Sequence, residues 1–123
     1  MSAQEKTSWP DILDDFFQNN QTCQVFDVAI SHLSPDHQKL ITRTKDIASS
    51  SWTSLQFGTN NGAPPLKGSP FEIDAKHYKL SVSLALYLLT GTPGEYSSVP
   101  ELIRNCEEYG VLQPGELTEP TIN

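Results

Sequence analysis

The chain has 123 residues and a net charge of −7, and 37% of its residues are hydrophobic. A chain of this length forms one domain and can bury a core without a metal ion or a disulfide bond. Its acidic charge disfavours nucleic acid, whose backbone is also negative, and favours a basic protein partner. No segment provides the ~18 consecutive apolar residues that cross a membrane. We therefore expect a globular domain that binds neither nucleic acid nor a membrane.

Two cysteines, Cys23 and Cys106, lie far apart in the sequence. The opening residues MSAQEKTSWP lack the basic and apolar regions of a secretory signal, which predicts a cytoplasmic location. Thiols usually stay reduced in that compartment, and free cysteines are among the most buried residue types. We expect two buried thiols rather than a disulfide or a catalytic nucleophile.

The first two predicted helices lie between Ser8 and Leu33. Ser8 can cap the first helix, Pro10 suits its first turn, and the helix should end near Asn20. A second helix is predicted from Gln21 to Leu33, although its middle could also form a short buried strand. Each helix has an apolar face at helical spacing: Ile12, Leu13, Phe16 and Phe17, with Trp9 beside them, in the first, and Cys23, Phe26, Ala29, Ile30 and Leu33 in the second.

The third predicted helix begins at Ser34-Pro35-Asp36, where a capping serine, a first-turn proline and an acidic residue follow one another. Gly58 can end this helix. One continuous stripe of apolar and small residues predicts its buried side: Leu40, Thr44, Ile47, Ala48, Ser51, Trp52 and Leu55.

The segment from Gly58 to Pro70 is rich in Gly, Pro and Asn, so it cannot continue a helix. At about 13 residues it is long for a connection within a compact domain, and loops of that length are often functional. The segment either presents Leu66 and Lys67 to a partner or only joins two helices.

The segment from Asp74 to Thr90 is the most ambiguous one. Its apolar residues alternate from Leu80 to Leu88, which is the period of a strand, but Leu, Ala and Lys favour helix. No second alternating run could pair with such a strand, so we predict a central helix over residues 74–90, capped by Asp74 and stopped by Gly91. Helical phasing gives it two apolar faces, with a narrow edge between them formed by Lys76, Lys79 and Ser83.

A fifth helix is predicted from Ser98 to Gly110, with Ser98 and Glu101 forming a reciprocal capping box. Its inward face would consist of Leu102, Ile103, Cys106 and Tyr109, and Val111 and Leu112 would then pack on the core. The sequence thus predicts an all-α, single-domain bundle of about five helices over residues 8–112. Residues 1–7 would be a flexible N-terminus and residues 113–123 a mobile polar tail.

No pattern of catalytic, nucleotide-binding or metal-binding residues is apparent. The adjacent acidic pairs Asp14-Asp15 and Glu107-Glu108 are predicted on outer helix faces. Neighbouring side chains on a helix diverge by ~100°, so neither pair can bind one ion together. His32 and His37 do not have the spacing of a zinc-binding helix, although they could converge with Asp36. We expect no cofactor. A small metal-binding protein or enzyme that uses His32, Asp36 and His37 is the alternative.

The sequence therefore favours a non-enzymatic protein-interaction module, such as an adaptor, an inhibitor or an accessory subunit. Its partner would bind through an acidic surface or through one edged by aromatic residues, since a small bundle cannot bury every large side chain. A homo-oligomer built through the first helix is a further alternative. The candidate partner-binding residues are Trp9, Phe17, Phe57, Leu66 and Lys67.

Overall fold

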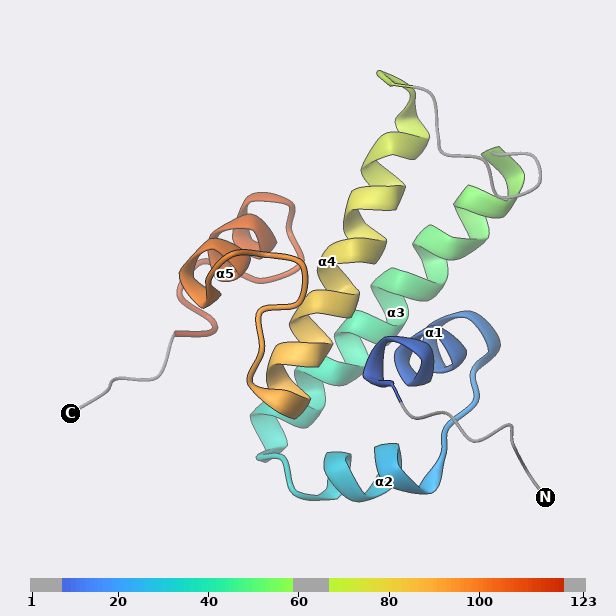
Figure 1. Ribbon diagram of the computed structural model, residues 1–123. Coiled ribbons are helices and arrows are strands. Elements are labelled where there is room, and N and C mark those ends of the chain that lie inside the picture. Colours follow the sequence, from blue (N-terminus) through green and yellow to red (C-terminus); the bar gives the residue numbers. More distant parts are fainter. Residues whose placement is uncertain (1–7, 59–66, 119–123) are drawn as a thin grey trace.

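The computed structural model describes residues 8–58 and 67–118, and these residues form five helices and no strand (Figure 1). The predicted all-α fold is confirmed, and so is the helical conformation of residues 74–90. The helices are α1 (Trp9–Asn19), α2 (Gln24–Ser31), α3 (Pro35–Gly58), α4 (Pro70–Thr90) and α5 (Val99–Glu108).

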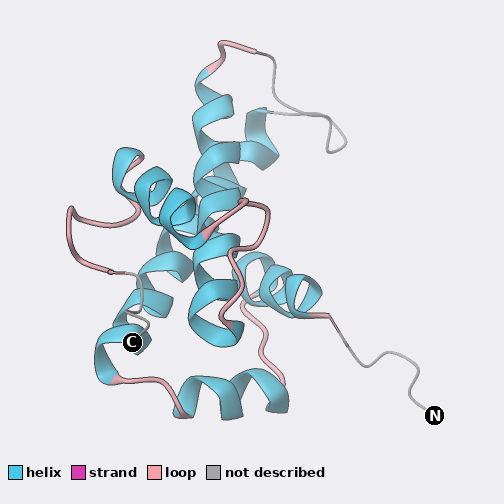
Figure 2. Ribbon diagram, turned by 60° about the vertical axis from the view of Figure 1, so that its left-hand side comes forward, coloured by secondary structure: helices cyan, strands magenta, loops and turns pink. Residues whose placement is uncertain are grey.

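The two longest helices, α3 and α4, form an antiparallel pair at the centre of the molecule (Figure 1). Helix α1 packs across both of them, and α5 packs on α4. Short α2 runs between α1 and α3, with loops on either side (Figure 2). Phe26 ties α2 to α1, because its ring centroid lies 4.6 Å from that of Phe16. The outer side of α2 leaves Val25 and Val28 exposed.

Serine and proline begin four of the five helices. The Oγ atoms of Ser8, Ser34 and Ser98 each accept a hydrogen bond from the backbone N–H three residues later, at 3.2–3.3 Å. These bonds satisfy N–H groups that have no partner within their own helix. The predicted starts of α1, α3 and α5 are therefore confirmed.

Helix α4 begins at Pro70, four residues before the predicted start at Asp74. Ser69 is its N-cap residue, and the carboxylate of Glu72 accepts a hydrogen bond from the N–H of Gly68 at 3.0 Å. The pair Ser69-Pro70 repeats the start signal of the other helices, and Asp74 lies within the helix rather than at its cap. The predicted end is right, because Gly91 adopts a left-handed conformation with φ 84°.

The capping box predicted for α5 forms only in part. Ser98 caps the helix, but the carboxylate of Glu101 accepts its hydrogen bond from the hydroxyl of Ser97, at 2.7 Å. Helix α2 is also shorter than predicted, since it begins at Gln24 and ends at Ser31.

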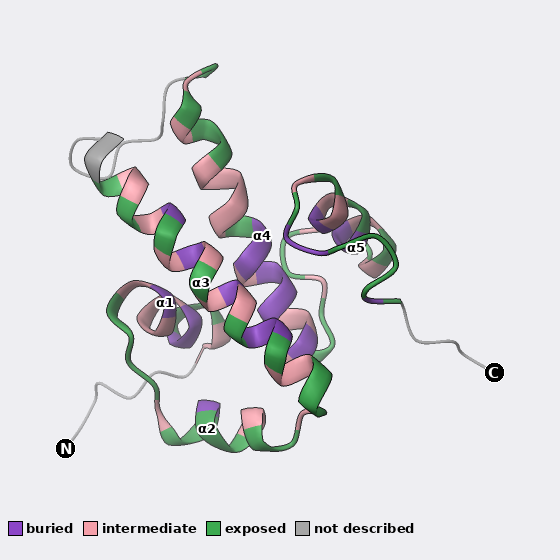
Figure 3. Cartoon of the chain, turned by 180° about the vertical axis from the view of Figure 1, so that it is seen from behind, coloured by how far each residue is buried: buried purple, intermediate pink, exposed green. Residues whose placement is uncertain are grey.

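The core lies where the other helices, which form the body of the molecule, pack around the N-terminal part of α3 and the C-terminal part of α4 (Figure 3). Ser83, predicted to lie with two lysines on a narrow edge between the apolar faces, is only 2% exposed, and neighbouring Ser81 is fully buried. The loop after α4 explains this burial, because the backbone of Gly94 lies directly against Ser83. Ile73, in the turn before the predicted start of this helix, is 54% exposed although it is apolar.

Beyond the core, α3 and α4 continue as a two-helix arm that extends away from the other helices (Figures 1 and 3). We define this α3–α4 arm as residues 53–58 and 67–75. None of its side chains that the structure describes is buried.

The chain after α5 packs on the body as far as Thr118, the last described residue. Val111 and Leu112 are buried, as predicted. The expectation of a mobile tail from residue 113 is wrong for residues 113–118. Leu117 is 7% exposed, and the carboxylate of Glu116 accepts two hydrogen bonds from the guanidinium of Arg43, one of them at 2.8 Å. We call residues 111–118 the C-terminal clip.

Candidate functional site

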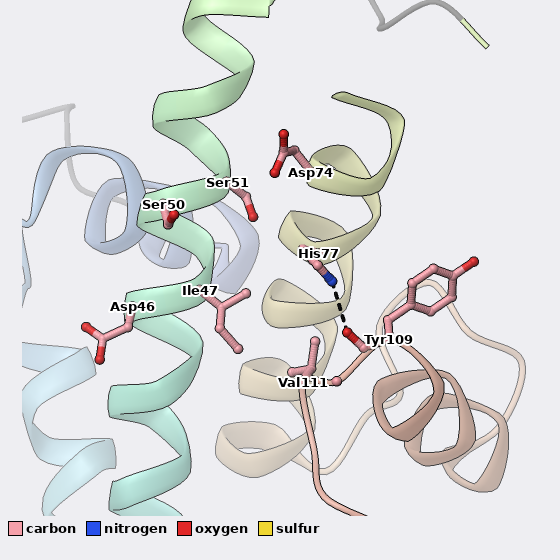
Figure 4. A pocket seen from close by; sticks show the side chains of 9 residues that line it. Asp46, Ile47, Ser50, Ser51, Asp74, His77, Tyr109 and Val111 are labelled. Carbon is pink, nitrogen blue, oxygen red and sulfur yellow. Dashed lines mark hydrogen bonds between the residues drawn. The ribbon is translucent and has the colours of Figure 1, made fainter. Parts of the chain in front are cut away.

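A groove of about 370 Å³ lies where the α3–α4 arm joins the body of the molecule (Figure 4). Helix α3 forms one wall and α4 the other, and the turn that follows α5 closes one end. We call it the acidic groove, because the charged residues lining it are Asp46 on α3 and Asp74 on α4.

Helical spacing brings four residues of α3 to this groove. Asp46 and Ser50 are one turn apart and form the rim, while Ile47 and Ser51 are also one turn apart and lie deeper. On α4, Asp74 and His77 line the opposite wall (Figure 4). The sequence places these groups far apart, and only the antiparallel packing of α3 on α4 joins them.

The bottom of the groove is apolar apart from one serine. Val111 is fully buried and Ile47 partly buried. Ser51 is only 3% exposed, and its side chain points from α3 towards α4, into the groove (Figure 4). No described residue provides a hydrogen-bond partner for the Ser51 hydroxyl. The Ser51 oxygen is not among the side-chain atoms sealed from solvent, so it is available to a ligand in the groove.

Neither carboxylate of the groove forms an ion pair with a described residue. Among the described residues that line the groove there is no lysine or arginine, and neither Asp46 nor Asp74 has an ion-pair partner there. The nearest lysines in sequence have other contacts, of which that of Lys76 is with Tyr109, itself a residue of the groove. Lys45 donates a hydrogen bond to Ser49 Oγ at 3.1 Å, and Lys76 Nζ lies 5.4 Å from the centroid of the Tyr109 ring.

His77 adds a hydrogen-bond acceptor to the groove. Its Nε2 atom lies 2.9 Å from the backbone oxygen of Tyr109 (Figure 4). A carbonyl oxygen can only accept, so Nε2 carries the hydrogen and, in the neutral ring, Nδ1 is an acceptor. The same bond joins α4 to the turn that closes the groove.

The structure separates the five residues predicted to bind a partner. Phe17 is 2% exposed, packed near the rings of Phe16 and Tyr78, so it offers no surface. The sequence predicts Phe17 at the surface of the first helix. Because α1 packs on both α3 and α4, however, a larger part of its surface is covered, including Phe17. Trp9 is partly buried on the same helix.

The other three predicted residues belong to the arm and its loop. Lys67 is exposed just before α4. Phe57 lies in the last turn of α3, but its side chain is outside the described residues, as is Leu66.

The alternative metal site finds no support. Within residues 8–58 and 67–118, no three His, Cys, Asp or Glu side chains are grouped so that they could hold a metal ion. His32 follows the end of α2 and is exposed, whereas Asp36 and His37 lie in the first turn of α3.

The cysteines are free thiols, as expected. Burial, with a smaller contribution from the charge of Glu107, raises the pKa of Cys106 to about 12. This thiol is therefore protonated at neutral pH and is a core residue rather than a nucleophile. Cys23 is partly exposed, less buried than the sequence suggested.

No known protein family, curated protein or solved structure matches the chain. In the described part of the chain, no helix has the length and apolar character needed to cross a membrane. The function must therefore be argued from the groove itself.

Proposed function

We propose that the chain is a non-enzymatic protein-interaction module that binds a basic segment of a partner protein in the acidic groove. It would act as an adaptor, an inhibitor or an accessory subunit. One observation carries the proposal: acidic residues from two different helices, Asp46 at the rim and Asp74 on the opposite wall, line a single groove in which neither has an ion-pair partner among the described residues. Both charges would attract a basic partner segment to this groove.

The surroundings of the groove suit a protein rather than a small ion. Tyr109 lines the acidic groove and also a second depression on the outer side of α4, which includes the exposed side chain of Ile73. Protein interfaces combine an apolar, aromatic centre with a polar rim. Lys76 and Lys79 also line this second depression, so a basic partner segment would contact Tyr109 from the side of the acidic groove.

The hydrogen bonds at the groove favour binding over catalysis. A serine nucleophile needs a general base within about 3 Å, itself oriented by a third group. His77 uses Nε2 to bind the oxygen of Tyr109, and no hydrogen bond joins it to Ser50 or Ser51. The groove thus has groups that can recognise a ligand, without the contacts of a catalytic triad.

The test is affinity capture from the native host with three forms of the full chain. They are the unmodified protein, the Asp46→Asn/Asp74→Asn double variant, and an Asp27→Asn/Asp36→Asn control. The control changes the net charge by the same amount at two exposed aspartates outside the groove. We expect a basic partner to be recovered by the unmodified protein and the control, and lost with the groove variant. Recovery that is equal for both variants, or no recovery at all, would overturn the proposal.

A further inference from the structure

We infer that the group recognised in the acidic groove is an arginine side chain, whose guanidinium lies between Asp74 and Ser51. This inference rests on the proposed function and adds the chemistry of the contact. Two independent observations support it: the unpaired carboxylate of Asp74, and the unpartnered Ser51 hydroxyl, which is 3% exposed and points into the same groove (Figure 4).

The polar groups of the groove are complementary to a donor-rich cation. Asp46 and Asp74 can only accept hydrogen bonds when ionised, and the tautomer of His77 makes Nδ1 an acceptor as well. The Ser51 hydroxyl can also accept. A guanidinium has five N–H donors and no acceptor, whereas an anion would meet two negative charges here.

The arrangement favours arginine over lysine. An arginine guanidinium can bind one carboxylate with two parallel hydrogen bonds. Its remaining N–H groups can then donate to a second acceptor. Asp74 can take the paired bonds while Ser51, across the groove on α3, takes one of the remaining donors. A lysine ammonium has three donors on one atom, so it cannot pair with a carboxylate in this two-point manner.

The apolar part of the groove suits the stem of the same side chain. Arginine buries its methylene groups along apolar surface and keeps its charge at polar partners. Ile47, which is only partly buried, provides such a surface beneath the rim. A volume of about 370 Å³ is near the lower end of ligand pockets, which span ~300–1,000 Å³, and thus suits a single side chain.

Asp46 has a different role from Asp74. Its carboxylate lies on the outer side of α3 and points away from α4 (Figure 4). It would therefore attract the cation to the groove without binding it directly. Charges at the rim of an interface mainly affect the rate of association and its salt dependence.

The test is a nuclear magnetic resonance titration of the ¹⁵N-labelled full chain with three probes. These are the N-acetyl, N-methylamide derivatives of arginine, lysine and citrulline; citrulline has nearly the shape of arginine but no charge. We expect the arginine probe to shift the amide signals of Ser51, His77 and Val111, with the lysine probe binding at least about threefold more weakly. The citrulline probe should leave these signals unchanged.

Variants assign the contact to individual residues. Asp74→Asn should weaken binding of the arginine probe by about tenfold, Ser51→Ala by a few fold, and Asp46→Asn by about twofold or less. The matched control, Asp27→Asn, should bind as the unmodified protein does, and the spectrum of each variant reports whether it is folded.

The outcomes separate this inference from the proposed function. If the lysine probe binds as tightly as the arginine probe, or if no probe shifts the groove signals, the arginine assignment is wrong. Partner capture that still depends on Asp46 and Asp74 would leave the proposed function standing. If the arginine probe binds as inferred but no partner is captured, the proposed function fails and the arginine site remains.

Discussion

At the residue scale, the contact between the backbone of Gly94 and the side chain of Ser83 explains why this serine of α4 is buried. A β-carbon added at Gly94 would lie 2.6 Å from Ser83 Oγ and 2.8 Å from Ser83 Cβ, and Gly94 has φ 65°. The loop after α4 therefore comes within van der Waals distance of the helix, which leaves Ser83 2% exposed. Serine suggests a solvent-facing edge when the helix is considered alone. The sequence pattern does not encode that a later loop returns to cover it.

Gly94→Ala should destabilise the protein more than Gly91→Ala does. Both glycines have positive φ, at 65° and 84°, so either alanine costs about 1–2 kcal/mol from backbone strain. A β-carbon at Gly91 meets nothing within 4 Å, whereas one at Gly94 collides with Ser83. We expect an additional loss of about 1–3 kcal/mol for Gly94→Ala, as for an overpacked core. Urea unfolding of the two variants measures this difference, and equal losses would show that the loop does not lie against α4 in this way.

At the element scale, most helix boundaries followed from local signals. Serine caps and first-turn prolines located the starts of α1, α3 and α5, and Gly91 located the end of α4. The start of α4 was missed because Ser69-Pro70 lies at the end of a stretch rich in Gly and Pro, where the same residue types also indicate turns. Ser69-Pro70 can begin a helix or form a turn, and the sequence alone does not distinguish the two.

The candidate site was less predictable than the helices. Asp46 lies outside the stripe predicted to be buried in the third helix, Asp74 was predicted to cap the fourth, and no spacing rule connects the two residues. Their meeting depends on which turn of α3 packs on which turn of α4, a register set by side-chain packing along the whole pair. Ser51 was correctly placed on the buried stripe, but its unpartnered hydroxyl becomes evident only once the groove is known.

The C-terminal clip gives α3 a pH-dependent contact. Hydrogen bonds from Arg43 and from the N–H of Gln113 lower the pKa of Glu116. A carboxyl group whose pKa is lower in the folded state stabilises the protein fully above its unfolded pKa, about 4.3, and loses this contribution as the pH falls through its folded pKa. Glu116→Gln should therefore reduce stability at pH 7 by about 1 kcal/mol or less, the usual contribution of an exposed ion pair.

The same variant should make stability less sensitive to acid below about pH 4.3, because the glutamine binds no proton. Urea unfolding measured at pH 7 and at pH 3 tests both expectations. Glu108→Gln is the matched control, since Glu108 is exposed and has no ion-pair partner among the described residues. If the two variants have the same pH profile, the clip does not hold Glu116 against Arg43 in solution.

At the scale of the whole molecule, the buried core is confined to one end of the long helix pair. The buried residues of α3 lie between Leu40 and Ser51, and those of α4 between Leu80 and Leu88. The α3–α4 arm retains helical hydrogen bonds but few buried apolar contacts (Figure 3). The acidic groove lies at the boundary between these two regions. A ligand there would contact the part of α3 that belongs to the core and the part of α4 that adjoins the arm.

This asymmetry predicts a gradient of stability along α3 and α4. Amide hydrogens in residues 40–51 and 80–88 should exchange with solvent only when the whole domain unfolds, because local opening there would expose the core. Amides in residues 71–75 should exchange at least about tenfold faster, since this part of the helix can open without disturbing that core. Hydrogen-exchange mass spectrometry, with rates corrected for intrinsic sequence effects, measures the difference between the two halves of α4. Uniform protection along α4 would mean that the arm opens only together with the body, and the groove would then lie within a single cooperative unit rather than at the edge of one.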